Sequence, residues 1–244
     1  MQPNWSRGTI AGKAVDWFDP PAKPRFALLY LHSVGCEALA ENAAFTAELR
    51  RLNLACCAPQ GGECWWADRI CPAFDDALTP VAHLLTNVVP AMLERWTLPA
   101  KAVAVAGISM GGQGALRLGF RHPDKFNVVA GIASALDVHD RYGLGSPLDA
   151  IYRSREACRQ DTAILHVGQG AYPKRIWFAC DPTDAEWFRG NDRLDEKLRA
   201  IGIPHTADLT TEAGGHSWAY FEAMAAPMLA FVVKGLEAES RRLM

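Results

Sequence analysis

The chain has 244 residues, and its 25 lysines and arginines against 27 aspartates and glutamates give a formal net charge of −2. With 50% hydrophobic and 21% charged residues, the composition excludes an intrinsically disordered chain, because enough apolar surface exists to offset the entropy of ordering. The absence of a basic excess argues against nucleic-acid binding, since little positive charge is available to displace phosphate counterions.

In chain order, short apolar runs between proline and glycine clusters predict buried strands. Because the runs are continuous rather than alternating, they are typical of a parallel sheet that is covered on both faces. The last run is less apolar than the others, so we expect it nearer an edge. The predicted strands span residues 26–31, 54–58, 102–108, 128–133, 176–180 and 205–210.

Apolar residues at three- and four-residue spacing predict helices between these strands. The predicted helices span residues 38–52, 78–96, 111–121, 187–201 and 218–234. The alternation predicts an α/β fold with a mostly parallel, doubly wound sheet flanked by helices. Residues 137–172 do not fit it, and we expect an irregular or small helical insertion there, over the site. No linker divides the chain, so we predict a single domain over residues 1–244.

The cellular context is predicted from what the sequence lacks. No apolar run reaches the ~18 residues of a membrane-spanning helix, and the first ten residues contain no apolar segment of a secretory signal. The seven cysteines are odd in number and form no Cys-x-x-Cys pair, which argues against a disulfide framework and a structural zinc site. We therefore expect a cytoplasmic protein without a membrane span. The oligomeric state stays open, a homodimer included.

The most informative segment is the Gly-x-Ser-x-Gly pattern of Gly107, Ser109 and Gly111, between a predicted strand and a predicted helix. A serine on such a sharp turn has strained dihedral angles, and side chains at the flanking positions would collide with the strand and the helix. The turn lifts the hydroxyl above the sheet, beside the positive end of the helix dipole. The pattern alone would be a common tight turn, but in this context it predicts that Ser109 is a nucleophile.

A serine hydroxyl needs a base, and in this topology the acid and then the histidine follow the serine. His216 lies in a Gly-Gly-His-Ser-Trp segment before the last predicted helix and is the predicted base. The acid that orients the imidazole should follow the strand at 176–180, which offers Asp181 and Asp184. We prefer Asp184, because an aspartate before proline often has a turn role. Asp137 is a third option.

Acyl transfer develops negative charge on a carbonyl oxygen, and backbone N–H groups stabilise that charge best. One donor is predicted at Met110, directly after the nucleophile. The other is predicted in the loop after the first strand, with Val34 as first choice and Ser33 as second. We expect His32 to support this turn rather than to take part in the reaction.

Two tryptophans are candidate substrate-binding residues. Trp65 lies in a loop after the strand at 54–58 and should face the same edge of the sheet, and Trp218 follows the predicted base. Buried aromatic residues also serve in cores, and the sequence does not separate these uses. No His, Cys, Asp or Glu set has metal-ligand spacing and no dinucleotide fingerprint is present, so we predict neither metal nor cofactor.

Taken together, these segments resemble the esterase D (putative esterase) family of α/β-hydrolases, relatives of S-formylglutathione hydrolases, feruloyl esterases and mycolyltransferases. The resemblance covers most of the chain. It rests on residues 31–36, residues 107–112, Asp184 within 180–191, and residues 214–218. Ser33 departs from the pattern, because the family usually has glycine at this position.

The resemblance implies the α/β-hydrolase fold and no required cofactor. It also implies a Ser109, Asp184 and His216 triad, with oxyanion donors at Met110 and Val34. We therefore predict a serine esterase that cleaves small-molecule carboxylic esters or thioesters through an acyl-enzyme on Ser109. Two alternatives remain: an acyltransferase with an alcohol acceptor, suggested by the mycolyltransferase branch, and a non-catalytic binding module, suggested by the altered oxyanion loop.

Overall fold

The computed structural model describes residues 2–242, and its strands form one eight-stranded sheet in the order β1-β2-β4-β3-β5-β6-β7-β8. The β1–β2 and β2–β4 pairs are antiparallel, and every pair from β4 to β8 is parallel. The strands are β1 Trp5–Ile10, β2 Lys13–Phe18, β3 Ala27–Leu31, β4 Ala55–Pro59, β5 Val103–Ile108, β6 Val128–Ile132, β7 Arg175–Ala179 and β8 Thr206–Asp208. The predicted α/β class and parallel strands are confirmed, and β8 lies at the edge as expected.

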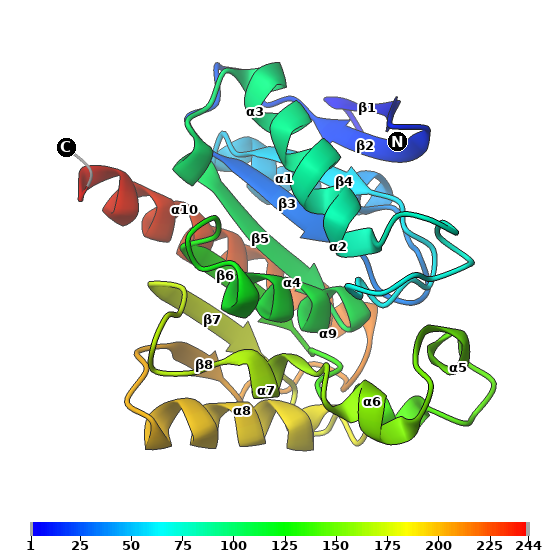
Figure 1. The fold of residues 1–244 in the computed structure, drawn as a ribbon. Coiled ribbons are helices and arrows are strands. Elements are labelled where there is room, and N and C mark those ends of the chain that lie inside the picture. The colour runs from blue at the N-terminus through cyan, green and yellow to red at the C-terminus, as the bar shows by residue number, and fades with distance from the viewer. Residues whose placement is uncertain (1, 243–244) are drawn as a thin grey trace.

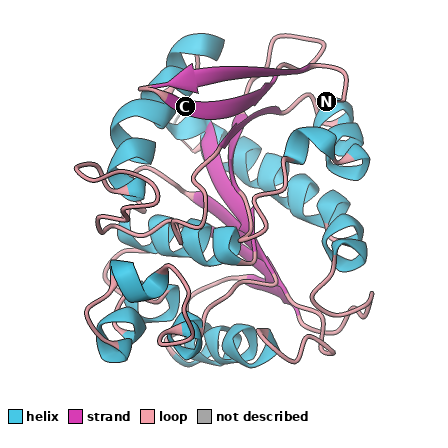
Figure 2. Ribbon diagram, turned by 90° about the vertical axis from the view of Figure 1, so that its right-hand side faces the viewer, coloured by secondary structure: helices cyan, strands magenta, loops and turns pink. Residues whose placement is uncertain are grey.

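Helices cover both faces of the sheet (Figure 2). The α-helices are α1 Ala43–Arg51, α2 Pro80–His83, α3 Val89–Trp96, α4 Met110–Arg121, α5 Leu148–Ile151, α6 Arg155–Arg159, α7 Ala163–His166, α8 Phe188–Ala200, α9 Trp218–Ala223 and α10 Ala225–Arg241. Shorter turns are η1 Leu39–Glu41, η2 Leu84–Val88, η3 Ala100–Ala102 and η4 Val138–Arg141.

Strand β3 shows why the apolar runs are continuous. Leu29 and Leu31 pack into the core that includes side chains of α2, α3, α4 and α8, whereas Leu28 and Tyr30 pack into the core with α1, α9 and α10. Successive side chains of a strand point to opposite faces, and here both faces are buried. The two cores therefore hold the central strands in place and leave their carboxyl ends free to carry a site.

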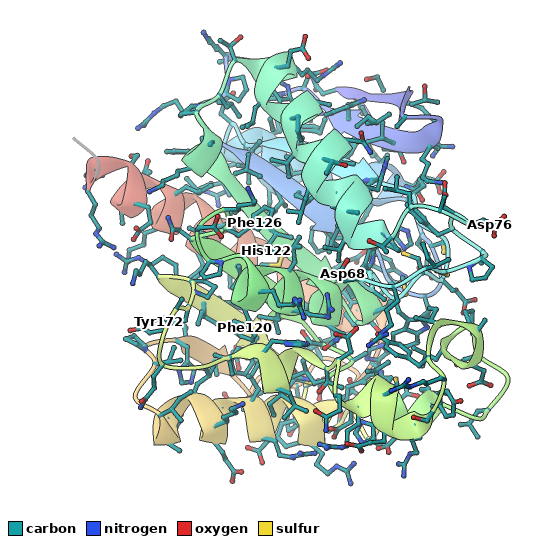
Figure 3. All side chains as sticks on the ribbon, viewed as in Figure 1. Asp68, Asp76, Phe120, His122, Phe126 and Tyr172 are labelled. Carbon is teal, nitrogen blue, oxygen red and sulfur yellow. The ribbon has the colours of Figure 1, made fainter. Side chains whose placement is uncertain are left out.

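The segment 137–172 contains only short helices: η4, α5, α6 and α7. Figure 1 shows α5 and α6 projecting from the body of the molecule, on the side toward which the arrows of β3 and β5 point. In Figure 3 the buried Phe120 and Phe126 lie near the C-terminal end of α4, away from α5 and α6. The exposed Asp76 lies on the loop between β4 and α2. The segment for which we predict an irregular or small helical insertion thus consists of short helices and the loops between them.

Two of the predicted helices are interrupted by prolines. The helix expected over 78–96 is divided by the π-type turn η2, next to Pro90, whose missing N–H cannot complete a regular helix. The helix expected over 218–234 ends at Ala223, and α10 starts anew with Pro227 in its first turn and continues to Arg241. Proline is tolerated in a first turn, where its N–H would have no partner.

The N-terminal hairpin of β1 and β2 was not predicted. It lies at the edge of the sheet, and several of its residues are exposed, such as Arg7, or only partly buried, such as Lys13, so no continuous apolar run marks it. Its two-residue turn has positive φ at both Ala11 and Gly12, and the only mark of it in the sequence is Gly12. Within residues 2–242, no helix combines the length and the apolar character needed to cross a bilayer.

Candidate active site

The predicted nucleophile lies on a sharp turn between β5 and α4. Ser109 has φ 55° and ψ −115°, a conformation that is rare for any residue with a side chain. The Ser109 N–H donates to the Ile132 carbonyl oxygen at 2.9 Å, and the Ser109 carbonyl oxygen accepts from Gln113 at 3.0 Å and from Ala135 at 3.1 Å. Backbone hydrogen bonds on both sides therefore hold the strained residue in place.

The two flanking glycines are required by close backbone packing. A Cβ atom at Gly111 would lie 1.9 Å from the Leu31 carbonyl oxygen, and one at Gly107 would lie 2.3 Å from the Gly111 carbonyl. No residue with a Cβ atom fits at these distances. The start of α4 therefore packs directly against the end of β3.

Three side chains from three segments form one hydrogen-bond chain. The Ser109 hydroxyl oxygen lies 3.0 Å from His216 Nε2, and His216 Nδ1 lies 2.8 Å from Asp184 Oδ2. A carboxylate only accepts, so Nδ1–H donates to Asp184 and the second ring nitrogen is left to accept the serine proton. Ser109 and Asp184 are buried and His216 is partly exposed, so solvent reaches the chain at its middle member, the imidazole.

Asp184 is held by its own loop. Its Oδ1 atom accepts from the backbone N–H groups of Glu186 and Trp187, each at 3.0 Å, just before α8 begins. The thiol of Cys180 lies 3.7 Å from Oδ2, on the side of the carboxylate that faces His216. The carboxylate is therefore oriented by backbone donors and presents its remaining oxygen to the imidazole.

The other two candidate acids have structural partners. Asp181 accepts from the backbone N–H groups of Ala213 at 2.7 Å and Gly215 at 2.9 Å, and so ties the end of β7 to the loop that carries His216. Asp137 forms ion pairs with Arg189 and Arg193 of α8. Of the three aspartates, Asp184 is the one in contact with the imidazole.

A cavity of about 240 Å³ lies beside the Ser109 hydroxyl. Its apolar walls are Val34, Trp65 and Trp187, and the remaining lining residues are Glu63, Ser109, Arg141, Ser146, Glu186 and His216. Trp65 therefore lines this cavity, and its role in substrate binding stays a prediction. Trp218 is not among these lining residues; it packs edge-on against Phe221, at 5.5 Å between ring centroids, and Phe221 packs against His216 at 5.2 Å.

Sequence reasoning missed part of the cavity wall. The apolar spacing predicts a helix from Trp187, whereas α8 begins at Phe188 and Trp187 lies in the loop of Asp184, three residues after it. Arg141 comes from the insertion, pairs with Glu186 and lies over the Trp187 ring, 5.7 Å from its centroid. No motif predicts how the insertion folds back to this point.

The predicted oxyanion donors come from two different segments. Met110 is the first residue of α4, where backbone N–H groups have no acceptor within the helix. Val34 lines the cavity from the loop after β3 and is 38% exposed. Their role as donors stays a prediction. Among residues 2–242, no three His, Cys, Asp or Glu side chains come together in a way that could hold a metal ion.

Solved structures show how this fold compares with known ones. An S-formylglutathione hydrolase from Agrobacterium tumefaciens superimposes with a TM-score of 0.77 at 16% identity, covering 97% of each chain. A ferulic acid esterase gives 0.73 at 20% identity, covering 91% of this chain and 93% of that one. Mycobacterium tuberculosis MPT51 gives 0.70 at 14% identity, covering 95% and 100%. At these identities the likeness establishes the fold, which is that of the α/β-hydrolases.

Sequence comparison gives the family. No curated protein matches the chain significantly. The sequence profile of the family described as "Putative esterase" matches residues 77–232, which is well over half of the 244 residues and includes Ser109, Asp184 and His216. The chain therefore belongs to the Putative esterase family.

Proposed function

We propose that this protein is a serine esterase that hydrolyses small carboxylic esters or thioesters through an acyl-enzyme on Ser109. The single observation that carries the proposal is the hydrogen-bond chain from the Ser109 hydroxyl through His216 to Asp184, at 3.0 and 2.8 Å. A nucleophile in contact with a base that is oriented by a buried acid is the arrangement that acyl transfer needs. Membership of an esterase family supports the same conclusion.

In the first half of the reaction, Ser109 Oγ forms a bond to the ester carbonyl carbon while its proton passes to His216 Nε2. The carbonyl oxygen becomes an oxyanion, stabilised by the Met110 and Val34 N–H groups. The intermediate then breaks the bond to the alcohol or thiol, which leaves with the proton from His216. Asp184 stays ionised throughout and stabilises the imidazolium.

In the second half, water replaces the leaving group. His216 takes a proton from the water as its oxygen attacks the acyl carbon, and the proton returns to Ser109 Oγ as the ester bond to the enzyme breaks. The carboxylic acid is released and the hydroxyl is restored. An alcohol in place of water would give acyl transfer by the same steps.

Hydrolysis of short p-nitrophenyl esters tests the proposal. The parent protein should release p-nitrophenol, and Ser109→Ala should reduce kcat by at least about 1000-fold, because the nucleophile is missing. Hydrolysis by Ser109→Ala at the parent rate would remove Ser109 from the reaction. Adding glycerol or a sugar and analysing the products separates esterase from acyltransferase: free acid as the only product supports hydrolysis, and a new ester supports transfer.

A further inference from the structure

The loop between β3 and η1 carries a second set of contacts that the triad does not use. We propose that His32 and Glu37 are positioning residues, which hold the peptide between Ser33 and Val34 with its N–H directed at the substrate's carbonyl oxygen. This inference rests on the proposed function, since it assigns these two residues to the oxyanion hole of that reaction.

The carbonyl oxygen of Ser33 is fixed by two donors. His32 Nδ1 lies 2.7 Å from it, and the Cys36 N–H donates to it at 3.1 Å, which closes a turn over residues 33–36. The neighbouring carbonyl oxygens are engaged as well: that of His32 accepts from Trp66 Nε1 at 3.2 Å, and that of Val34 accepts from the Cys36 thiol at 3.4 Å.

Fixing one carbonyl fixes the donor across the same peptide. The peptide between Ser33 and Val34 is planar and trans, so its N–H points opposite to its C=O. The Ser33 carbonyl points toward the buried ring of His32, whereas Val34 lines the cavity above Ser109. The Val34 N–H is therefore directed away from His32. Reversing this peptide would break both hydrogen bonds to the Ser33 oxygen and turn a carbonyl toward the developing negative charge.

The contacts of His32 define its tautomer. Its Nε2 atom accepts from the Gly61 N–H at 2.9 Å, so this nitrogen carries no proton, and Nδ1–H must be the donor to Ser33. The ring is 2% exposed and packs edge-on against Trp66, with centroids 5.0 Å apart. Burial lowers the pKa of His32, which favours this neutral form.

Glu37 holds the exposed side of the same loop. The Ser33 hydroxyl donates to Glu37 Oε2 at 2.8 Å. A Cβ atom at Gly35 would lie 2.1 Å from Glu37 Oε1, so the carboxylate lies directly against the backbone of Gly35. This clamp uses the hydroxyl of Ser33, the position at which the family usually has glycine. The serine that replaces the usual glycine therefore forms a hydrogen bond, to Glu37, that stabilises the loop.

Two substitutions at His32 separate its two hydrogen bonds. Asparagine places an amide nitrogen the same number of bonds from Cβ as Nδ1, so His32→Asn can still donate to Ser33 but loses the acceptor for Gly61. Glutamine places an amide oxygen at the distance of Nε2, so His32→Gln keeps the Gly61 contact and loses the Ser33 donor. Both variants are compared with the parent protein by p-nitrophenyl ester hydrolysis and by thermal unfolding.

His32→Gln should lower kcat by about 100-fold or more with little change in KM, because an oxyanion donor acts in the transition state. His32→Asn should stay within about 10-fold of the parent. Equal rates in the two variants, or a slower His32→Asn than His32→Gln, would overturn the role of the Ser33 contact. An inactive parent protein would instead contradict the proposed function itself, so the two failures are distinguishable.

The Glu37 clamp gives a second test on an exposed residue, for the case that the buried His32 variants do not fold. Glu37→Ala and Ser33→Ala should each lower kcat several-fold at unchanged KM, and the double variant should be no slower than either single one. Glu37→Gln keeps an acceptor for the Ser33 hydroxyl and should restore most of the rate. Parent-like kcat in both alanine variants would show that the clamp does not position the oxyanion donor.

Discussion

At the scale of single residues, the site depends on a serine that is held in an unfavourable conformation. A positive φ at a residue with a side chain costs on the order of 1–3 kcal/mol and persists only where the surroundings enforce it. Here the hydrogen bonds to Ile132, Gln113 and Ala135 enforce it for Ser109. The glycines at 107 and 111 contribute as well, because only residues without a Cβ atom let β3, β5 and α4 approach this closely around Ser109.

The packing at Gly111 predicts the effect of one added methyl group. Gly111→Ala should lower the free energy of unfolding by more than about 3 kcal/mol, because the new Cβ would overlap the Leu31 carbonyl oxygen. Gly168→Ala is the matched control, since a Cβ there meets no atom within 4 Å. Urea denaturation of both variants measures the difference. Equal stability of the two would mean that β3 and α4 are not packed this closely.

The two aspartates of the loop after β7, Asp181 and Asp184, should respond differently to substitution by asparagine. Asp184→Asn should lower kcat by roughly 10⁴-fold, because an amide no longer holds the His216 tautomer that accepts the serine proton. Asp181→Asn leaves the contact between His216 and Asp184 unchanged and should keep far more activity. Ester hydrolysis by both variants tests the assignment. A larger loss in Asp181→Asn would favour Asp181 as the acid.

At the scale of secondary-structure elements, loops far apart in the sequence are tied together by buried polar groups. Gln113 of α4 accepts from the Ala163 N–H at 3.0 Å, and one turn later Arg117 pairs with the buried Asp161. Tyr152 also donates to Asp161, at 2.8 Å. The helix that follows Ser109, α4, therefore anchors the far end of the insertion that carries Arg141 to the cavity.

The hydrogen bonds between Asp181, which follows β7, and the loop that carries His216 predict a pH dependence of stability. Burial by itself raises the pKa of Asp181, but hydrogen bonds from Ala213, Thr183 and Gly215 outweigh it and lower the pKa to about 2. A group with a lowered pKa in the folded state stabilises the fold above its unfolded pKa, and this contribution is lost as the pH falls through the folded value.

Asp181→Asn should therefore be less stable than the parent protein at pH 7, on the order of 2 kcal/mol. The difference should shrink as the pH falls from about 4 to about 2, where the parent carboxylate becomes protonated. Denaturant unfolding of both proteins across this pH range measures it. A difference that stays constant down to pH 2 would contradict the assigned hydrogen bonds.

Elements were predictable where local chemistry determines them. Local patterning predicts β3 and β5, because burial on both faces requires continuous apolar runs. It also predicts the sharp turn at Ser109, because the strained backbone requires glycine on both sides. The hairpin of β1 and β2 was missed, since an edge strand needs no continuous apolar run. The break between α9 and α10 was also missed, although Pro227 marks it.

At the scale of the whole molecule, the parallel sheet brings distant segments to one edge. Ser109 and His216 are 107 positions apart and in contact, because β5 and the loop before α9 end at the same side. The order of serine, acid and histidine made these three side chains predictable. The cavity wall was less predictable. Arg141 and Trp187 reach it only because the insertion and the segment before α8 pack there, and sequence patterns do not report such tertiary packing.

The reactivity of the Ser109 hydroxyl toward a fluorophosphonate, measured by labelling and peptide mass spectrometry, tests the proposed nucleophile most directly. The parent protein should carry the label on Ser109 alone, Ser109→Ala should carry none, and His216→Ala should react about 1000-fold more slowly, because the base is missing. Label on a different residue, or labelling of His216→Ala at the parent rate, would contradict a nucleophile at Ser109 that is activated by His216.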